Sequence, residues 1–230
     1  MKNIQLTLAA IIATLMLSTS AFAGMGLGVT GSLVNVHANG EELEGGVANQ
    51  INTKATASNQ TYSGSLFGEY TWGNGFTLGV DYIPGSADVN SKRITRQDIE
   101  TSKEGAGLGV PTNVDRSAQA EVENHLTYYA ELPVHGGLYV KAGYVTLDVN
   151  TTEVSGATLY GNTDTDGMLL GFGFKNETSG NWYYKVEATH TEFDTITLTG
   201  TGHTAGSAAA NQVKADLDVT KATFALGYAF

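Results

Sequence analysis

The feature that most constrains the fold of this chain is the alternation in residues 223–230. Large apolar or aromatic side chains occupy every second position, and small ones lie between them. The large residues are Phe224, Leu226, Tyr228 and Phe230, and the small ones are Ala225, Gly227 and Ala229. Because successive side chains of a strand point to opposite faces, one face here is bulky and apolar and the other nearly bare. Such a strand suits a wall between lipid and a narrow lumen, and a soluble β-sandwich seldom ends on one.

The amino terminus has the pattern of an export signal. Lys2 precedes an apolar run over residues 6–17, and a small-x-small pattern ends at Ala23. We therefore expect Sec export and cleavage, which divides the chain into a signal peptide at residues 1–23 and one outer-membrane barrel domain at residues 24–230. The apolar run is shorter than the roughly 20 residues that a spanning helix needs. The sequence thus predicts that strands cross the membrane.

Composition narrows the classes of function. The chain has no Cys, which excludes disulfides, thiolate catalysis and a lipidated cysteine. Its formal net charge is −11 at pH 7, whereas nucleic-acid-binding proteins present basic patches, so we expect no nucleic-acid partner. A secreted chain without disulfides needs another source of stability. A closed barrel supplies it, because every backbone N–H and C=O is paired around the ring.

Eight segments alternate with period two and have the length of membrane strands or slightly more. They run over residues 25–36, 62–72, 76–83, 120–132, 138–149, 166–175, 182–198 and 215–230. The connections are alternately short (73–75, 133–137 and 178–181) and long (39–61, 84–119, 150–165 and 199–214). The pattern predicts an all-β fold, an eight-stranded antiparallel up-and-down transmembrane β-barrel with short periplasmic turns and long extracellular loops.

A ten-stranded barrel is the alternative, with a further hairpin inside residues 84–119. That stretch is rich in charged residues, among them Lys92, Arg93 and Asp98, and no run within it offers an uncharged alternating face. Eight strands are therefore favoured.

Charge separates the two faces of the predicted strands. A charge on the lipid face costs about 2–4 kcal/mol at the bilayer midplane, whereas the lumen tolerates it, so we assign the charged positions to the lumen. They are Glu69, Asp81, Glu123 and Glu131 on the second to fourth strands, and Lys141, Lys175, Lys185, Glu187 and Lys221 on the last four. An acidic wall and a largely basic wall would meet across a lumen that side chains fill. We expect a salt-bridge network that closes the lumen.

Aromatic side chains of the opposite parity gather near the short turns. Trp72, Phe76, Trp182, Tyr184, Tyr228 and Phe230 would form a periplasmic aromatic girdle at the depth of the lipid headgroups. A buried sandwich core also holds aromatic residues, but the terminal strand and the alternation of short and long connections favour the girdle.

The signal peptide, eight alternating strands, three tight turns, four long loops and terminal Phe230 together resemble the small outer-membrane β-barrels of the OmpA/OmpX type. The resemblance covers the whole mature chain, but the peptidoglycan-binding domain that often follows in OmpA-type proteins is missing. It implies a place in the outer membrane of a Gram-negative bacterium and contact with outer-membrane lipid and lipopolysaccharide. It also implies insertion by the barrel-assembly machinery through the C-terminal strand.

Two short motifs suggest ligands. Residues 26–31 match the glycine pattern of dinucleotide sites, but a strand continues where that site needs a helix. Residues 162–167 resemble the start of a calcium loop, but Gly173 stands where an EF-hand has its bidentate Glu. A weak surface site on Asp164 and Asp166 remains an alternative to a solvated turn. We predict no cofactor and no metal.

Two clusters contain residue types that could catalyse a reaction or bind a ligand. His190, beside Glu192, is the nearest approach to a catalytic set, but no Ser accompanies it, and we predict no enzyme. A basic cluster in the second long loop would either bind lipopolysaccharide phosphates or balance nearby carboxylates. It consists of Lys92, Arg93, Arg96, Lys103 and Arg116.

These features predict a structural or surface-interaction protein, for anchoring or adhesion, which contacts a surface ligand through its loops and has a lumen closed by salt bridges. The opposed charged walls support a second hypothesis, a narrow pore for ions or small solutes. A lipid-modifying barrel enzyme is the third.

Overall fold

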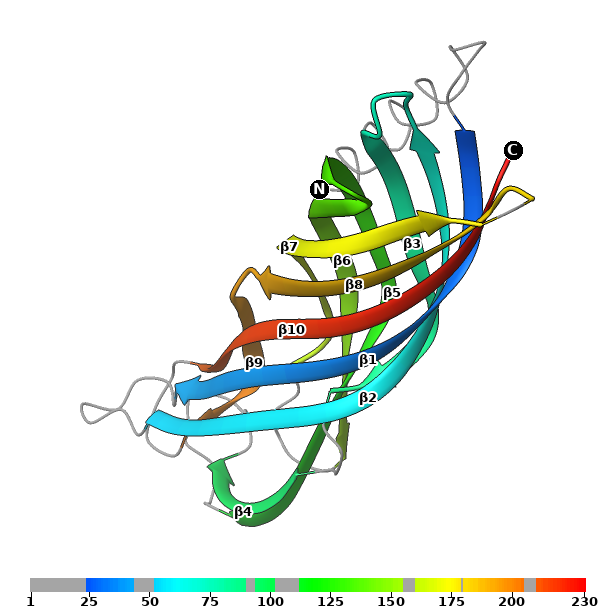
Figure 1. Ribbon diagram of the computed structural model, residues 1–230. Coiled ribbons are helices and arrows are strands. Elements are labelled where there is room, and N and C mark those ends of the chain that lie inside the picture. Colours follow the sequence, from blue (N-terminus) through cyan, green and yellow to red (C-terminus); the bar gives the residue numbers. More distant parts are fainter. Residues whose placement is uncertain are drawn as a thin grey trace.

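The computed structural model describes residues 24–43, 52–89, 94–101, 112–154, 160–178, 180–204 and 210–230, and it consists of antiparallel strands (Figure 1). The strands are β1 (Gly24–Leu43), β2 (Asn52–Thr71), β3 (Thr77–Asp88), β4 (Ile94–Thr101), β5 (Thr112–His135), β6 (Leu138–Val154), β7 (Thr163–Glu177), β8 (Trp182–Phe193), β9 (Ile196–Thr204) and β10 (Ala210–Ala229). The predicted signal peptide lies outside the described residues. In the described part of the chain, no helix has the length and apolar character that crossing a membrane requires.

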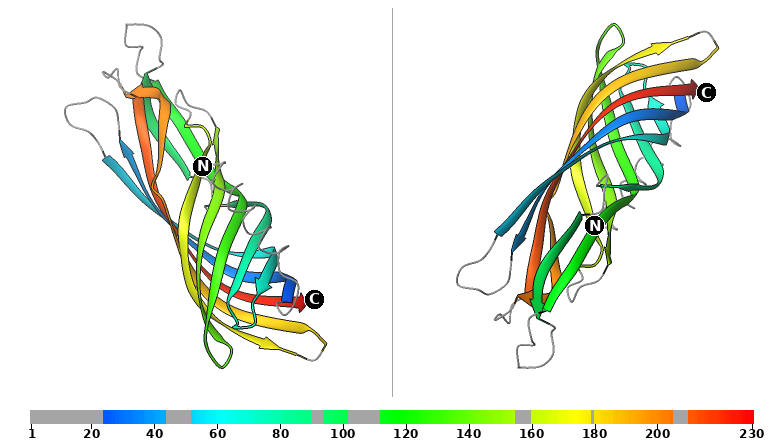
Figure 2. Two further views of the ribbon diagram at one scale, coloured as in Figure 1. Left: turned by 90° about the horizontal axis from the view of Figure 1, so that it is seen from above. Right: turned by 90° about the horizontal axis from the view of Figure 1, so that it is seen from below.

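Eight of the strands close a ring. Around it the order is β1, β2, β3, β5, β6, β7, β8 and β10, and β10 pairs with β1 again. This seam between the first and last strands runs without interruption from the Gly26–Ala229 pair to the Leu43–Gln212 pair. Figure 2 shows the strands wrapping round the barrel with a strong tilt. The predicted eight-stranded up-and-down barrel is confirmed.

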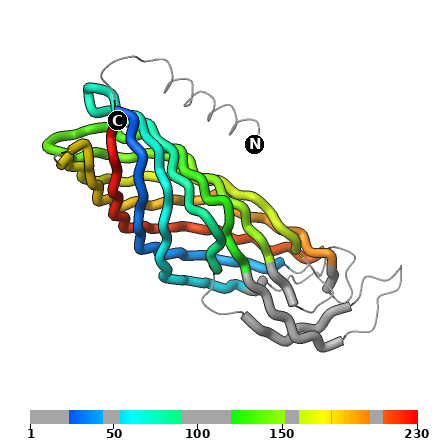
Figure 3. The backbone as a smooth tube through the Cα atoms, turned by 90° about the vertical axis from the view of Figure 1, so that its right-hand side faces the viewer, coloured from blue at the N-terminus to red at the C-terminus, as the bar shows by residue number. Residues whose placement is uncertain are grey.

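The short connections are tight turns at one end of the barrel. The backbone N–H of Gly75 donates to Trp72 O at 2.8 Å. Gly136 and Gly137 join β5 to β6 with φ values of 59° and 87°, the positive values that a two-residue hairpin turn needs. The C-terminus lies at this end (Figure 3).

At the other end the strands continue well beyond their predicted limits. β1 and β2 stay paired up to Leu43 and Asn52, so most of the predicted loop at residues 39–61 is sheet. β4 was not predicted, and of β9 only residues 196–198 fall within a predicted strand. β4 pairs with β5 above the end of β3, β9 pairs with β10 above the end of β8, and β4 and β9 pair with each other. The sheet therefore has ten strands, although the ring has eight.

The predicted strand at residues 182–198 is wrong in one respect, because it is broken between β8 and β9. Asp194 and Thr195 leave the ladder at this point. The Thr195 hydroxyl donates to Asp216 Oδ1 at 2.6 Å, and the Thr165 hydroxyl donates to the carbonyl of Asp194 at 3.2 Å. Short polar side chains that bond to nearby groups compete with strand pairing in this way.

The pairing of β2 with β3 stops part of the way up the barrel, at the Leu66–Tyr82 pair. Beyond it, β3 follows β5 alone. The cause is the sequence Pro84-Gly85, since Pro has no backbone N–H to donate and Gly85 has a φ of 90°. The register of β3 against β5 shifts at the same place. One wall of the barrel is thus open on a line between β2 and β3.

The outer face of the barrel is apolar. On β7, Met168, Leu170 and Phe172 are 62–65% exposed, and the neighbouring strands carry similar residues such as Val140 and Val186. Such a continuous apolar surface is rare against water and normal against lipid. These residues have the charge-free parity of their strands, and this parity points outward, away from the lumen.

Candidate functional site in the barrel lumen

Six charged side chains meet in the periplasmic half of the lumen. They are Glu69, Glu131, Glu187, Lys141, Lys175 and Lys185, which we call the ion cluster. Lys185 is its centre, since its Nζ lies 2.6 Å from Glu69 Oε2 and 2.7 Å from Glu131 Oε1. Three carboxylates face three ammonium groups, so the formal charges of the cluster cancel.

The other two lysines complete the cluster from neighbouring strands. Lys141 Nζ lies 2.8 Å from Glu187 Oε2, and Lys175 Nζ lies 3.1 Å from Glu69 Oε1. Together with Lys185, they give every carboxylate at least one close cation, which meets the condition under which buried charges are tolerated.

Two tyrosines share the carboxylates with the lysines. Tyr129 donates to Glu69 at 2.8 Å, and Tyr139 donates to Glu187 at 2.6 Å. Lys141 Nζ also lies 3.9 Å from the centre of the Tyr129 ring, a cation–π contact. Sequence analysis assigned neither tyrosine to the network. Their hydroxyls satisfy lone pairs that the lysines leave free.

Inward glycines make room for the aromatic rings in the lumen, among them those of Tyr129 and Tyr183. A Cβ at Gly79 would overlap the Tyr129 ring, and one at Gly227 would overlap the Tyr183 ring. Glu69 and Lys185 are only 1% exposed. At the level of the ion cluster the lumen is therefore filled by side chains.

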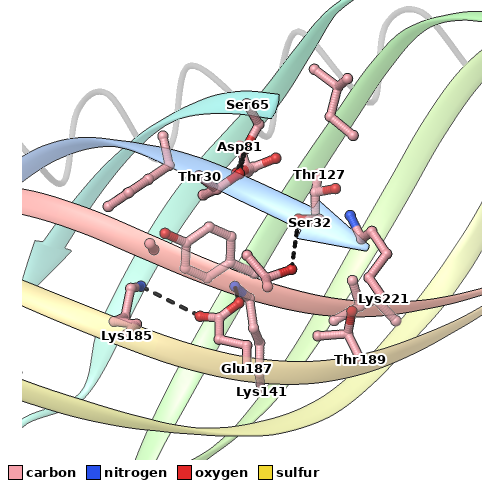
Figure 4. A pocket seen from close by; sticks show the side chains of 16 residues that line it. Thr30, Ser32, Ser65, Asp81, Thr127, Lys141, Lys185, Glu187, Thr189 and Lys221 are labelled. Atoms are coloured by element: carbon pink, nitrogen blue, oxygen red, sulfur yellow. Dashed lines mark hydrogen bonds and ion pairs between the residues drawn. The ribbon is translucent and has the colours of Figure 1, made fainter. Parts of the chain in front are cut away.

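Three of the nine predicted lumenal charges lie outside the ion cluster. Asp81 and Lys221 line a small polar cavity of about 30 Å³ above it (Figure 4), where Ser65 Oγ donates to Asp81 at 2.5 Å. The prediction that Glu123 faces the lumen is wrong. Asn124, with a φ of 51°, forms a bulge that inverts the alternation of β5, so that Val122 packs inside and Glu123 pairs in register with Asp148 on the outer face.

The upper half of the lumen has the opposite chemistry. Eight buried apolar side chains, which we call the apolar cluster, pack there from β1, β6, β7, β8 and β10. They are Val34, Val145, Leu147, Val149, Leu169, Phe193, Leu217 and Val219, none more than 9% exposed. Sequence analysis missed this cluster. The signal was present in the sequence of β10. Above Lys221 the inward positions become apolar and the outward ones charged, as where Asp216 and Asp218 flank Leu217.

An apolar cavity of about 210 Å³ lies beside the apolar cluster and reaches the open line between β2 and β3. Its inner wall includes Val36, Leu147 and Leu217, and its rim is formed by residues 61–64 of β2 and by residues 83–89, at the end of β3 and just after it. We call this opening the side mouth. Asn59 Nδ2 donates to the carbonyl of Asp88 at 3.2 Å and bounds the mouth at its outer end.

The six predicted girdle residues lie near the turns in two groups. Trp72 and Phe76 have ring centres 5.3 Å apart beside the β2–β3 turn. Tyr228 lies 5.3 Å from Trp182 and 5.2 Å from Phe230 across β8 and β10. Tyr184 instead stacks on Phe224, at 6.3 Å. The girdle's role at the lipid headgroups stays a prediction.

The other candidates do not assemble into a site. His190 is an exposed residue that hydrogen-bonds Thr220 Oγ1 at 3.0 Å and lies 3.7 Å from Glu192. Among the described residues, no three His, Asp or Glu side chains form a group that could hold a metal ion. Of the basic loop cluster, Lys92, Arg93 and Lys103 lie outside the described residues, and Arg96 and Arg116 are described only as paired backbone.

Comparison with known proteins gives a family and a fold. The family model described as "Outer membrane protein beta-barrel domain" matches residues 7–230. The outer membrane protein OprG from Pseudomonas aeruginosa is 10% identical, with a TM-score of 0.50 over 92% of this chain and 98% of that chain. AlkL, solved in DMPC lipid bilayers, is 14% identical, with a TM-score of 0.44 over 93% of each chain. No curated protein matches the sequence.

Proposed function

Because this chain belongs to the outer-membrane β-barrel family and so lies in the outer membrane of a Gram-negative bacterium, we propose that it binds small apolar molecules in its upper lumen. It exchanges them with the outer leaflet through the side mouth, while the ion cluster closes the lumen toward the periplasm. The observation that carries the proposal is the apolar cavity open between β2 and β3.

The lining of the cavity favours an apolar ligand. Ligand sites are typically concave and mostly apolar, with a few polar groups. An apolar ligand that lies against Val36, Leu147 and Leu217 removes its own surface from water, which contributes roughly 25 cal/mol for each Å² of apolar surface removed.

The side mouth lies at the depth of the outer leaflet. Tyr62 is nine residues above Thr71, the periplasmic end of β2. With a rise of about 3.3 Å per residue and a tilt of about 40°, Tyr62 is roughly 23 Å above that end, near the top of an apolar band about 25 Å tall. Leu66 and Tyr82, just below the mouth, are 57% and 39% exposed on the outer face. A molecule leaving the mouth would therefore enter lipid.

The ion cluster favours this lateral route over a straight one. Passage from the cavity to the periplasm would require separating Lys185 from Glu69 and Glu131, contacts of 2.6 and 2.7 Å between nearly unexposed groups. Breaking a buried ion pair is strongly unfavourable. The side mouth offers a path that crosses no such pair.

Photolabelling of the protein in lipid nanodiscs tests the proposal. A neutral alkyl diazirine alcohol should label lumenal Leu147 and Leu217, and mass spectrometry of peptides would locate the label. Val36→Trp fills the cavity and should reduce lumenal labelling severalfold. Leu33→Trp, on the lipid face of the same strand, is the matched control and should leave it unchanged. Labelling confined to lipid-facing residues such as Leu170 would contradict the proposal.

A narrow pore for ions is the second candidate. It is supported by two cavities at the turn end, of about 460 and 320 Å³, which reach Glu131 and Glu69 of the ion cluster from the periplasmic side. In this function the cluster would open as a gate. If Glu69→Gln and Lys141→Met leave the conductance in planar bilayers unaltered, the lumen is not an ion path.

The anchoring or adhesion function expected from the loops, and contacts with lipopolysaccharide or the barrel-assembly machinery, stay predictions. The loop tips at residues 44–51, 102–111 and 205–209 lie outside the described residues. A lipid-modifying activity at His190 likewise stays a prediction.

A further inference from the structure

Lys221 on β10 is set apart from the other lumenal lysines. Its side chain lines both the polar cavity above the ion cluster and the apolar cavity behind the side mouth (Figure 4). Within the described part of the chain it makes no hydrogen bond or ion pair, whereas Lys141, Lys175 and Lys185 all do. An ammonium group without a direct counter-ion therefore stands at the floor of an apolar cavity.

Two carboxylates share the polar cavity with Lys221: Glu187, which lies 2.8 Å from Lys141 in the ion cluster, and Asp81. Asp81 accepts a hydrogen bond from Ser65 Oγ at 2.5 Å and is not in ion-pair contact with Lys221. Ser65 in turn is hydrogen-bonded to Thr30. These bonds hold Asp81 toward β1 and β2. Its charge nevertheless disfavours a second negative charge nearby, so a ligand with a single negative charge suits the site better than a dianion.

Three further polar atoms close to this floor lack partners. His125 Nδ1, on the wall of the apolar cavity, is buried without a hydrogen bond. The hydroxyls of Thr127 and Thr189, which line the polar cavity, are also buried and unpaired among the described residues. Buried polar atoms in folded proteins nearly always have a partner. Because these three unpaired atoms lie around one ammonium group that also lacks a partner, they indicate a ligand with more than one acceptor oxygen.

Resting on the proposed function, we propose that the ligand is a small amphipathic anion, an alkyl carboxylate. Its carboxylate accepts charge-assisted hydrogen bonds from Lys221 and a hydrogen bond from a neighbouring hydroxyl or His125. Its alkyl chain lies against Leu147 and Leu217 and points toward the side mouth. The cavity of about 210 Å³ equals roughly seven water molecules at about 30 Å³ each, which suits a single chain of medium length.

Competition against the diazirine alcohol probe in nanodiscs tests this inference. Three competitors share a ten-carbon chain and differ in the head: decanoate, decanol and decyltrimethylammonium. Decanoate should displace lumenal labelling at a concentration at least about tenfold lower than decanol, because only its head forms charged hydrogen bonds. The cationic competitor should be the weakest.

Variants of Lys221 assign the effect to this residue. Lys221→Met and Lys221→Gln should each abolish the advantage of decanoate over decanol, and Lys221→Arg should retain it. Lys54→Met removes an exposed lysine far from the cavity and is the control. The inference is overturned if decanoate and decanol compete equally in the unaltered protein, or if a folded Lys221 variant keeps the preference. Loss of all lumenal labelling would instead refute the proposed function on which it rests.

Discussion

The two halves of the lumen differ in chemistry although one ring of strands encloses both. The lower half holds a balanced ion cluster, and the upper half holds the apolar cluster. The difference follows from what surrounds the barrel. Where lipid covers the outside, apolar residues such as Phe172 and Leu226 face outward and the polar ones face the lumen. Toward the outer rim of this apolar band and beyond it, polar residues such as Asp216 and Asp218 take the outward positions, and the apolar residues turn inward to form a core.

The halves also differ in how well they are filled. At the level of the ion cluster, inward glycines such as Gly79 lie directly under aromatic rings, which leaves little free volume there. In the upper half, the irregularity at Pro84 and Gly85 separates β3 from β2 and leaves a cavity beside the apolar cluster. The ion-cluster region is thus suited to holding the barrel closed, and the cavity region to binding a ligand.

The largest expected effect comes from removing the centre of the ion cluster. Lys185→Met leaves Glu69 and Glu131 without their closest cation, and it should lower the free energy of unfolding by about 3–5 kcal/mol. Denaturant titration in lipid vesicles measures it. Lys54→Met, whose side chain is 77% exposed, should change stability by less than about 0.5 kcal/mol. Equal stability of the two variants would show that the cluster does not hold the lower lumen together.

A smaller loss is expected from filling the lower lumen. Gly79→Ala places a methyl group against the Tyr129 ring and should cost about 1–3 kcal/mol, as overpacking does. Gly31→Ala is the matched control, because nothing lies within 4 Å of its added Cβ. The same denaturant titration compares them. If Gly79→Ala were as stable as Gly31→Ala, the lower lumen would be less tightly packed than its contacts indicate.

The smallest expected effect concerns the side mouth and is measured by hydrogen exchange in the unaltered protein. Residues 59–65 of β2 pair only with β1, whereas residues 66–71 pair with both β1 and β3. Amide hydrogen exchange in nanodiscs should therefore show protection lower by about tenfold or more, on average, in the first segment. Equal protection would mean that the wall is closed at this level.

Much of the barrel was predictable, because lipid enforces strict alternation. The parity of Glu69, Lys141 and Lys185 follows from the absence of charge on the opposite face, and the glycine-rich turns mark where strands reverse. The upper half was harder to predict. The same rule, applied to the upper part of β5, places Val122 outside and Glu123 inside, whereas the bulge at Asn124 reverses both.

The extra strands and the cavity depend on partners distant in the sequence. β9 exists because β8 breaks at Asp194 and because β10 continues upward to receive a new neighbour. Nothing in the sequence of β4 alone gives an apolar alternation, and its pairing with β5 and β9 stabilises it as a strand. Pro84 and Gly85 predict an irregularity in β3, but the sequence alone does not predict that β2 stops pairing with β3 at this point.

The seam between β1 and β10 has a consequence for the time course of biogenesis. It joins the beginning of the barrel to its end, with Gly26 opposite Ala229 and a hydroxyl contact of 2.8 Å between Ser32 and Thr223. Because the two edges lie about two hundred positions apart in the sequence, closure is a late event that waits for synthesis and translocation of the whole polypeptide. Until then both edges are unsatisfied and prone to pair with other chains. The interval between export and closure is therefore the stage at which this chain is most exposed to misassembly.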